Sequence, residues 1–359
     1  MLSAILRILH TPKIGVLKFW QLWDHFSDLE KISQWLRENG YLIPPEDWAK
    51  QHLVVHAKHK VQIIHFLDPS FPDFLKHING CPPVLYCKGD ITLIDKPMIG
   101  IVGARGASIP MVHFIKRLSS DLGKAGYVIV SGLATGIDTA AHLGALTTGT
   151  IGICAGGVDQ IYPQQNGQLY KDVGLLISEV PIGTKPASYL FPKRNRIIAG
   201  LTVGIVVAEA GFQSGSLITG QCAVEFNREV FVVPGSPLDT RSRGGNKLIK
   251  EGAYLIENAD DITRILRTKG IDAPANKYNT DCHPDENQDP ENNNLDPDVR
   301  QDDKTKNDII SHLSHIPISL DDLAEQTKKP MDTLRKELAR LEIKGQITYS
   351  PNGHITLKL

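Results

Sequence analysis

The middle of the chain alternates between two hydrophobic patterns. Short runs of apolar and β-branched residues are separated by stretches in which apolar residues recur at helical spacing, as at Met111, Ile115, Leu118 and Leu122. Strands that are apolar throughout and separated by helices are typical of a parallel sheet covered on both faces. We therefore predict a doubly wound α/β domain. Its predicted strands are Met98–Val102, Tyr127–Val130, Thr150–Cys154, Leu175–Ser178, Gly204–Ala208 and Glu229–Val233, with Ala253–Ile256 as a candidate last strand.

The regions on either side have helical patterns of their own. Residues 1–60 place apolar side chains at helical spacing in Val16–Phe26 and Leu29–Leu36, which predicts a small helical domain. Residues 306–359 predict three helices and then two strands that meet at the turn sequence SPNG. This pattern is typical of a winged helix. The predicted helices are Asp308–Leu313, Leu320–Gln326 and Met331–Ile343, and the predicted strands are Gln346–Tyr349 and His354–Leu359.

An acidic segment precedes the predicted winged helix. Residues 276–303 hold nine acidic side chains against Lys277 and Arg300, a local charge of −7, whereas the whole chain carries −1. With three prolines and almost no apolar residues, this segment buries too little surface to offset its ordering entropy. We predict a disordered linker at 269–305, after an α/β domain at 61–268. The remainder of the chain is mildly basic, with a net charge of +6.

Composition excludes several classes of protein. A chain of 359 residues exceeds what one core usually organises, so we expect two or three domains. The longest run without a charged side chain, Thr139–Val158, is broken by glycines, and the first residues have no signal-peptide cleavage site. We therefore expect a cytoplasmic protein without a membrane span. Five cysteines without a C-x-x-C pair support neither a disulfide framework nor a metal site.

The loops that leave the predicted strands carry the candidate chemistry. In a parallel sheet these loops open onto one edge, and five of the six combine glycine with Ser, Thr or Arg. Glycine allows close backbone approach, helix N-termini offer unpaired N–H groups, and arginine adds forked bonds to phosphate oxygens. The edge is therefore predicted to bind anions. Neither a G-x-G-x-x-G nor a Walker lysine motif is present, so we expect no cofactor. The loops are Gly103–Ser108, Ser131–Asp138, Ala155–Asp159, Glu179–Asn195, Glu209–Ser216 and Pro234–Gly245.

One of these loops ends in the stretch FPKRNRIIAG, which joins cations to an aromatic ring and an apolar run. We interpret Arg194 and Arg196 as phosphate ligands beside Phe191. The alternative is a solvated helix start whose arginines pair with acids such as Glu179 or Glu209.

Catalytic patterns are weaker. Asp138 and His142 lie four residues apart and could share a helix face as an acid–base pair or as metal ligands, but a capping Asp and a core His are the preferred interpretation. The SGS sequence at 214–216 lacks the G-x-S-x-G pattern. Glu179 and Glu209 each follow a strand and are interpreted as structural partners of nearby arginines. We expect no catalytic residue and no enzymatic activity.

The predicted winged helix has basic residues interleaved with glutamates, so binding to a DNA groove and binding to protein both stay open. Its apolar positions Leu334, Leu338 and Leu341 are predicted to face inward. The basic residues are Lys328, Lys329, Arg335, Lys336, Arg340 and Lys344.

Long motifs in a fixed order resemble the bacterial DNA-processing proteins of the DprA (Smf) family. They are SGLATGIDTAAHLGAL at 131–146, ISEVPIGTKPASYLFPKRNRIIAGLTVGIVVAEAGFQSGSLITGQCAVEFNREVFVVPGSP at 177–237 and GGNKLIKEGA at 244–253. The resemblance covers roughly Val61–Leu266. It implies an extended Rossmann domain that binds single-stranded DNA, protects incoming DNA in natural transformation and loads the RecA recombinase, without hydrolysing the strand. It also implies a homodimer.

The resemblance further implies the residues of the DNA site. Arg105 matches the arginine of a G-[ST]-R motif, while the sequences RNR at 194–196 and SGS at 214–216 match two further motifs. The implied DNA-binding residues are Gly103, Arg105, Ser131, Gly132, Thr135, Phe191, Lys193, Arg194, Asn195, Arg196, Ser214, Gly215 and Ser216.

Two positions depart from the family pattern. Thr135 replaces the arginine of the usual SGLARGID, and Ala104 replaces a hydroxyl residue. Lys185, Arg241 and Arg243 are candidate substitutes for the missing cation. Two other functions remain as alternatives. One is a phosphoribohydrolase-like Rossmann enzyme, although PGSP at 234–237 lacks its P-G-G-x-G-T-x-x-E signature, and the other is a winged-helix transcription regulator.

Overall fold

The computed structural model describes residues 1–212, 214–271, 323, 327, 334, 337, 338, 341, 342, 347–349 and 355–357. The chain divides into two compact units, Met1–Thr280 and Asp281–Leu359. The predicted acidic linker and the basic side chains of the predicted winged helix lie outside the described residues. The finer division into four segments therefore stays a prediction.

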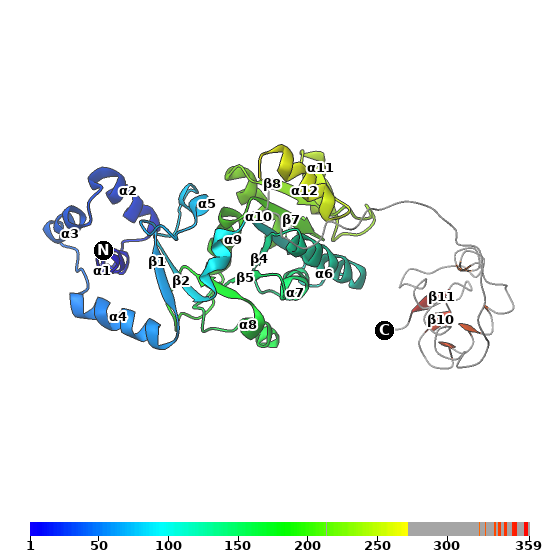
Figure 1. The fold of residues 1–359 in the computed structure, drawn as a ribbon, viewed down its shortest axis with the longest axis horizontal. Helices are drawn as coiled ribbons and strands as arrows, with labels where there is room; N and C mark the ends of the chain where they lie inside the picture. The colour runs from blue at the N-terminus through cyan, green and yellow to red at the C-terminus, as the bar shows by residue number, and fades with distance from the viewer. Residues whose placement is uncertain are drawn as a thin grey trace, which may run out of the picture. The chain divides into compact units, whose positions relative to one another are not determined.

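A nine-stranded sheet forms the centre of the first unit, with the order β1-β2-β6-β5-β4-β3-β7-β8-β9 (Figure 1). The strands from β6 to β9 in this order are parallel, whereas β2 is antiparallel to β6 and β1 is antiparallel to β2. The strands are β1 Gln62–His65, β2 Val84–Gly89, β3 Met98–Gly103, β4 Val128–Ser131, β5 Thr150–Ile153, β6 Leu175–Ser178, β7 Gly204–Ala208, β8 Glu229–Val232 and β9 Tyr254–Leu255.

The parallel strands match the predicted ones to within one residue, which confirms the doubly wound α/β fold. The patterns did not predict the antiparallel strands β1 and β2. β1 lies at the edge of the sheet and begins exposed, whereas β2 lies between β1 and β6 and ends exposed at Lys88 and Gly89. β1 has only two apolar residues in a row. β2 has a buried apolar run, Val84–Cys87, but only the short turn η1 separates it from β3, so it stands outside the alternation of strands and helices that marked the others.

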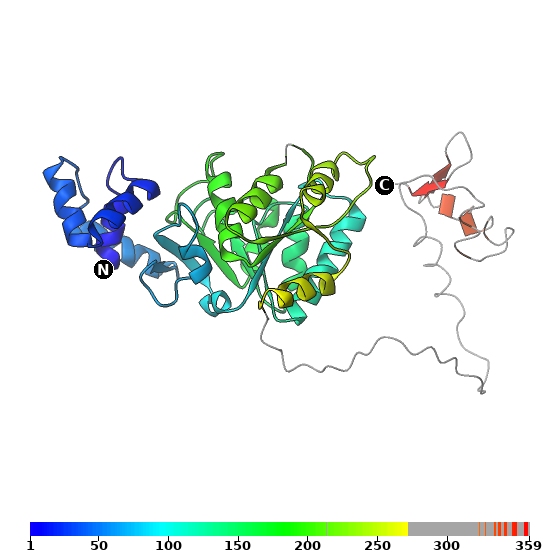
Figure 2. The same cartoon turned by 90° about the horizontal axis from the view of Figure 1, so that it is seen from above.

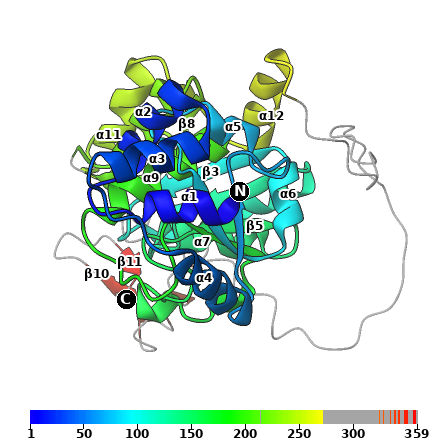
Figure 3. The same ribbon diagram turned by 90° about the vertical axis from the view of Figure 1, so that its left-hand side faces the viewer.

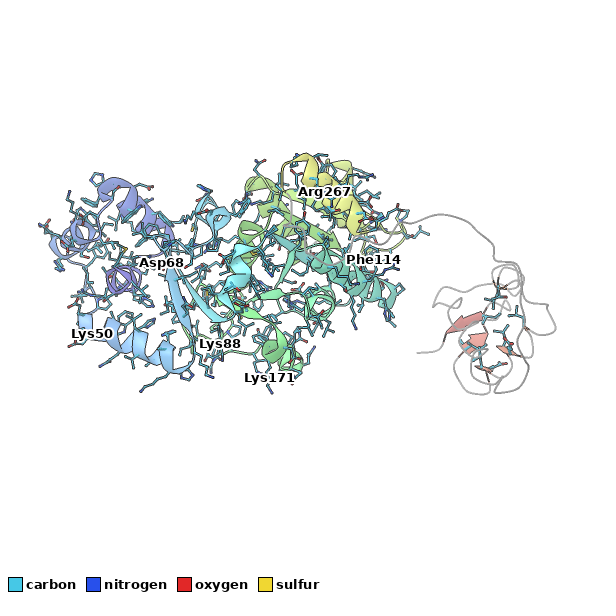
Figure 4. The ribbon with its side chains drawn as sticks, in the orientation of Figure 1. Lys50, Asp68, Lys88, Phe114, Lys171 and Arg267 are labelled. Atoms are coloured by element: carbon cyan, nitrogen blue, oxygen red, sulfur yellow. The ribbon has the colours of Figure 1, made fainter. Side chains whose placement is uncertain are left out.

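Helices cover both faces of the sheet (Figure 2). Because side chains alternate along a strand, Ile99 and Ile101 point to one face and pack with α6, α7 and α12, whereas Val102 points to the other and joins a core with α9 and α10. Figure 4 labels Phe114 on α6 and Arg267 on α12, two helices that contact each other. The helices are α5 Asp73–Lys76, α6 Ile109–Lys124, α7 Ile137–Ala145, α8 Leu169–Asp172, α9 Leu190–Leu201, α10 Gly215–Glu225, α11 Arg243–Lys250 and α12 Ala259–Thr268, with 3-10 turns η1 Ile91–Asp95 and η2 Gln164–Asn166.

Four helices precede the sheet and lie at its β1 end (Figure 1), and Figure 3 views the chain from their side, with α1 in front. The predicted helical patterns at Val16–Phe26 and Leu29–Leu36 are confirmed as α2 and α3. These helices share one apolar core with the sheet, and the rings of Trp20 and Trp23 both lie 4.8 Å from the ring of Phe66. The four helices are α1 Leu2–Leu9, α2 Val16–Phe26, α3 Leu29–Glu38 and α4 Glu46–Lys58.

The second unit contains the antiparallel hairpin of β10 Ile347–Tyr349 and β11 Ile355–Leu357, as predicted. Leu334 and Leu338 are buried against these strands and Leu341 packs beside them, which confirms that the three leucines face inward. Apolar residues of a helix and a hairpin therefore form a small core of their own.

Candidate nucleic-acid interface

A cavity of about 260 Å³ opens at the carboxyl ends of β3 and β7. From β3 the chain proceeds outward to β6 on one side of the sheet, and from β7 it proceeds outward to β9 on the other. Ligands of open α/β sheets bind at such a reversal of strand order. The predicted site residues that line this cavity are Gly103, Arg105, Phe191, Arg194, Asn195, Ser214, Gly215 and Ser216.

A second cavity, of about 140 Å³, adjoins the first, since both are lined by Arg105, Phe191 and Arg194. It adds the predicted residues Gly132 and Thr135. It also includes three residues that the sequence analysis missed, namely Tyr162, Pro163 and Gln165. The remaining predicted residues, Ser131, Lys193 and Arg196, are not among the lining residues of either cavity.

The cationic stretch is helical, which corrects the prediction of a loop reaching Asn195. Helix α9 begins at Leu190, and Pro192 is its third residue. The error has a local cause, because a proline in the first turn reads as a loop signal although its missing N–H leaves no helical bond unmade there.

The helical period separates the cations of this stretch. Residues three or four positions apart share a helix face, so Phe191 and Arg194 lie together on the cavity side. Lys193 and Arg196 lie on another face. The Lys193 ammonium is 5.6 Å from the ring centroid of Tyr189, and Lys193 lines a separate groove beside the N-terminal helices.

Arg194 is only 7 % exposed, and its guanidinium connects β5 and the loop after β4 to α9. Nη1 donates to the carbonyl of Gly132 after β4 and to that of Ile153 in β5, the latter at 3.1 Å, while Nε donates to Asn195 Oδ1 at 3.1 Å. A Cβ on Gly132 would lie 1.7 Å from Nη1, so this approach requires glycine. Burial lowers the pKa of the guanidinium, an effect opposed by the nearby charge of Asp138. None of these hydrogen bonds uses Nη2, so the group keeps donor capacity while its position is fixed.

The other two side chains of the RNR sequence are also bonded to protein groups. Asn195 Nδ2 donates to the carbonyl of Gly215 at 3.2 Å, which ties α9 to the start of α10. Arg196 forms an ion pair with Glu179 and donates to the carbonyl of Gly80. The alternative of pairing with Glu179 is thus observed for Arg196, whereas Arg194 bonds to backbone carbonyls.

Arg105 supplies an exposed cation to both cavities. Its guanidinium carbon lies 5.7 Å from the ring centroid of Phe191, a cation–π geometry. A second anion-binding group of this cavity is the N-terminus of α10. Its N-cap Ser214 accepts from the backbone N–H of Ser216 at 3.4 Å. The N-terminus of an α-helix attracts anions through unpaired N–H groups and its partial positive charge. The first cavity therefore suits a phosphate, and the neighbouring ring suits a base.

Two predicted residues have structural roles. Ser131 is fully buried, and its hydroxyl donates to the carbonyl of Ile101 at 2.6 Å. A Cβ on Gly103 would lie 2.0 Å from the carbonyl oxygen of Ala208, so glycine allows β3 and β7 to pair up to the cavity. Contact of Ser131 and Gly103 with DNA stays a prediction.

Comparison with protein families decides the affiliation of the chain. The model of DNA recombination-mediator protein A matches residues 62–267, and the DprA winged helix domain matches residues 293–353. The chain belongs to the DprA/Smf family. The resemblance inferred from the motifs, and the combination of a Rossmann-like domain with a winged helix, are thereby confirmed.

Individual members of the DprA/Smf family are similar to this chain in sequence and in structure. DNA processing protein DprA of Bacillus subtilis is 41 % identical over 225 residues, which cover 61 % of this chain and 76 % of that protein. The X-ray structure of DprA from Streptococcus pneumoniae has a TM-score of 0.56 at 32 % identity, covering 70 % of this chain and 97 % of that one. A structure of the Helicobacter pylori protein that addresses its single-stranded DNA binding mode has a TM-score of 0.53 at 30 % identity, covering 58 % and 97 %.

The departure from the DprA/Smf pattern at Thr135 changes the second cavity. Thr135 lines this cavity where the family pattern has an arginine. Lys185, Arg241 and Arg243 are not among the described lining residues of either cavity, and Arg241 pairs with Asp239 at 2.7 Å. The structure therefore supports none of the three as a substitute cation. The second cavity keeps Arg105 and Arg194 but has uncharged residues elsewhere.

Asp138 and His142 are both buried, which confirms the interpretation of His142 as a core histidine. Asp138 Oδ2 accepts from the backbone N–H groups of Gly132 at 3.1 Å and Ala134 at 3.3 Å, so it supports the β4 loop rather than capping α7. The hydroxyl of Thr150 donates to Ile129, so His142 Nδ1 donates to the Thr150 oxygen. His142 Nε2 then carries the lone pair and has no hydrogen-bond partner.

Acid should destabilise the fold through His142. Burial, aided by the charge of Arg194, lowers the pKa of this histidine from 6.5 to about 3. The unfolded chain therefore binds more protons between these values, and stability falls as the pH falls through them. We expect this residue to cost about 2 kcal/mol of unfolding free energy at about pH 5 relative to about pH 7.

Urea denaturation of the His142→Asn variant at both pH values measures this contribution, because asparagine keeps a donor but cannot take up a proton. The variant should lose about 2 kcal/mol less than the wild type on acidification. His113→Asn, at an exposed position on α6, is the matched control. Equal pH dependence of the His142→Asn variant and the wild type would contradict the expectation.

The two strand-end glutamates have structural partners. Glu179 pairs with Arg196, as interpreted from the sequence. Glu209 instead accepts from the backbone N–H and the hydroxyl of Ser108, at 2.7 and 2.5 Å, and so joins the β7 loop to the β3 loop. In the described part of the chain, no cluster of His, Cys, Asp and Glu side chains is arranged to hold a metal ion. Within that part, too, none of the helices has the length and apolarity needed to cross a membrane.

Proposed function

We propose that this protein binds single-stranded DNA in the two adjoining cavities, protects incoming DNA and loads RecA recombinase onto it during natural transformation. The observation that carries the binding proposal is the pairing of an exposed arginine with an aromatic ring beside a helix N-terminus. Arg105 lies over Phe191, and Ser214 caps the N-terminus of α10 in the same cavity. Membership of the DprA/Smf family supports the RecA and homodimer parts of the proposal.

The chemistry of the cavities favours a nucleic-acid strand without a reaction. Backbone N–H groups and a guanidinium stabilise phosphate oxygens, and an aromatic face stacks on any base. Among the described lining residues the carboxylate is Asp138, which is buried and already accepts two backbone N–H groups. A carboxylate in this state supports the loop rather than activating a water, so we propose binding without hydrolysis.

Fluorescence anisotropy tests the proposal with labelled oligothymidine and a duplex of the same length. The full chain should bind the single strand more tightly than the duplex, and the logarithm of its affinity should fall linearly with the logarithm of the salt concentration. The slope should be about −0.7 for each phosphate contact between about 50 and 200 mM salt. Equal affinity for the two forms, or affinity that does not change with salt, would be incompatible with the proposal.

A further inference from the structure

We propose that His56, on the N-terminal helix α4, is a positioning residue for the DNA site and makes single-stranded DNA binding sensitive to acid. Helix α4 contacts the edge strand β1 (Figure 1). His56 acts through the β6–α9 loop, residues 179–189, which leads directly into the helix that carries Phe191 and Arg194. The effect on DNA rests on the proposed function, whereas the contact of His56 with the loop does not.

Two hydrogen bonds fix the protonation state of His56, which is only 2 % exposed. Its Nδ1 lies 2.7 Å from the carbonyl oxygen of His52, which can only accept, so Nδ1 carries the proton. Its Nε2 lies 3.2 Å from the backbone nitrogen of Ile182, whose N–H can only donate, so Nε2 is the acceptor. The imidazole is therefore neutral, with both nitrogens bonded, and it connects α4 to the β6–α9 loop.

The rest of the β6–α9 loop is anchored on the segment after β5. The N–H of Gly183 donates to both carboxylate oxygens of Asp159, at 2.9 and 3.0 Å. The carbonyl of Thr184 accepts from the N–H of Gly157 at 2.9 Å. Gly183 has φ of +80°, a left-handed conformation that favours glycine. His56 bonds to the residue before this glycine, so α4 and the β5 segment hold adjacent residues of the loop.

The β6–α9 loop is joined to α9 at both of its ends. At its start, Glu179 forms an ion pair with Arg196 of α9. At its end, the carbonyl of Ala187 accepts from the N–H of Leu190, the first residue of α9, at 2.9 Å. Coupling between separate parts of a protein is carried by such chains of hydrogen bonds and packed side chains. A loop released at Ile182 should therefore also release the start of α9, which carries the aromatic ring and the buried guanidinium of the cavities.

Acid should break the bond between His56 and Ile182. A protonated imidazole is a donor at both nitrogens, so it has no lone pair for the N–H of Ile182. Burial lowers the pKa of the His56 imidazole below its usual 6.5, whereas the bond to His52 and the charge of Asp159 oppose this effect. The contact is therefore intact at neutral pH and is lost as the pH falls through the folded pKa, which lies below 6.5.

The titratable groups that surround His56 come from several elements. On α4, the ring centroid of His52 lies 4.2 Å from that of His56, and burial lowers the pKa of His52 to about 4. On β2, the ring centroid of Tyr86 lies 4.9 Å away, and burial raises the pKa of its hydroxyl. Both therefore stay largely neutral between about pH 5 and about pH 7.5. The remaining groups are His10 on α1, His59 after α4 and Asp159 after β5.

Hydrogen exchange followed by mass spectrometry tests the contact in the full chain without DNA at about pH 7.5. The His56→Phe variant keeps a ring but has no acceptor, so the peptide that contains Ile182 should exchange about 5- to 150-fold faster than in the wild type. The His56→Gln variant offers an amide oxygen that cannot be protonated in this pH range, and it should restore protection. His59→Gln is the matched control, because His59 is exposed at the end of the same helix.

Anisotropy titrations with oligothymidine measure the effect on DNA binding. His56→Phe should bind at least about 5-fold more weakly than the wild type at about pH 7.5. Between about pH 7.5 and about pH 5, the wild type should lose at least about 5-fold more affinity than His56→Gln does. His59→Gln should keep the pH dependence of the wild type.

Thermal unfolding midpoints check that each variant is folded, and the comparison of His56→Gln with the wild type does not require His56→Phe to fold. Equal exchange at Ile182 in His56→Phe and the wild type would overturn the contact. If the wild type and His56→Gln lose affinity equally in acid, the positioning role is wrong while the proposed function stands. If the wild type does not bind oligothymidine at all, the proposed function fails and the positioning role fails with it.

Discussion

Replacing Arg194 with methionine is expected to lower the free energy of unfolding of the first unit by about 3 to 5 kcal/mol. Methionine fills much of the volume but donates no hydrogen bond, so the carbonyls of Gly132 and Ile153 lose a shared donor. The charge of Asp138 also loses its neighbouring cation in a buried environment. Removing one member of a buried charged pair is costly because the other remains desolvated.

The loss should depend on pH. Burial raises the pKa of the Asp138 carboxyl, and Arg194 opposes that rise, so the pKa should rise further in the variant. A carboxyl whose folded pKa exceeds its unfolded value binds more protons in the folded state, and its contribution to stability is lost as the pH rises. The destabilisation should therefore be smaller at about pH 5 than at about pH 7. Adding Asp138→Asn should recover part of the loss at neutral pH.

Urea denaturation followed by far-UV circular dichroism measures these effects across the sheet. Fluorescence would be a poor probe, because all four tryptophans lie between residues 20 and 48, in the N-terminal helices. Arg117→Met is the control, since the Arg117 side chain on α6 is 86 % exposed. A change of less than about 1 kcal/mol for Arg194→Met, as expected of a surface substitution, would show that the buried contacts are not needed for stability.

Replacing Phe191 with alanine is expected to weaken single-stranded DNA binding by about 5- to 150-fold, the effect of losing one stacked base. Arg105→Ala should weaken binding too, but with a different signature, because it removes a phosphate contact. Its salt slope should become shallower by about 0.7, whereas the slope of Phe191→Ala should change little. The two effects should not add in the double variant, since the guanidinium and the ring contact each other.

Anisotropy titrations of the two single variants and the double variant over a salt series measure these quantities. Arg117→Ala removes an exposed arginine on α6 that lines neither cavity and serves as the control for net charge. If Phe191→Ala and Arg117→Ala bind alike, the ring does not contact a base. If Arg105→Ala keeps the wild-type slope, its guanidinium does not contact a phosphate.

The parallel part of the fold could be predicted because a strand buried on both faces is apolar without interruption. Leu175–Ser178 and Gly204–Ala208 were placed at their observed bounds for that reason. Strand β1 could not, because it lies at the edge of the sheet and has only two apolar residues in a row, and β2 could not, because no helix separates it from β3. The shared position of the glycine-bearing loops could also be predicted, because the topology of a parallel sheet brings the loops after its strands to one edge.

The roles of the individual side chains within the site could not be predicted in the same way. Sequence motifs grouped Lys193, Arg194 and Arg196 as one cluster, but helical geometry places them on different faces and burial commits Arg194 and Arg196 to protein groups. Tyr162 was missed because it lies three residues beyond Asp159, where the predicted loop ended, and has no cationic neighbour in the sequence. Only the fold places it beside Phe191.

The contacts of Arg194 also affect how phenotypes are interpreted. A side chain that joins two strands to a helix contributes to the amount of folded protein in the cell as well as to its binding surface. Losses of even about 1 to 2 kcal/mol change cellular abundance several-fold. A cell with a substitution at Arg194 is therefore expected to be short of the protein itself, and its phenotype would resemble that of reduced expression. Immunoblot quantification alongside the phenotype separates scarcity of the protein from failure to bind.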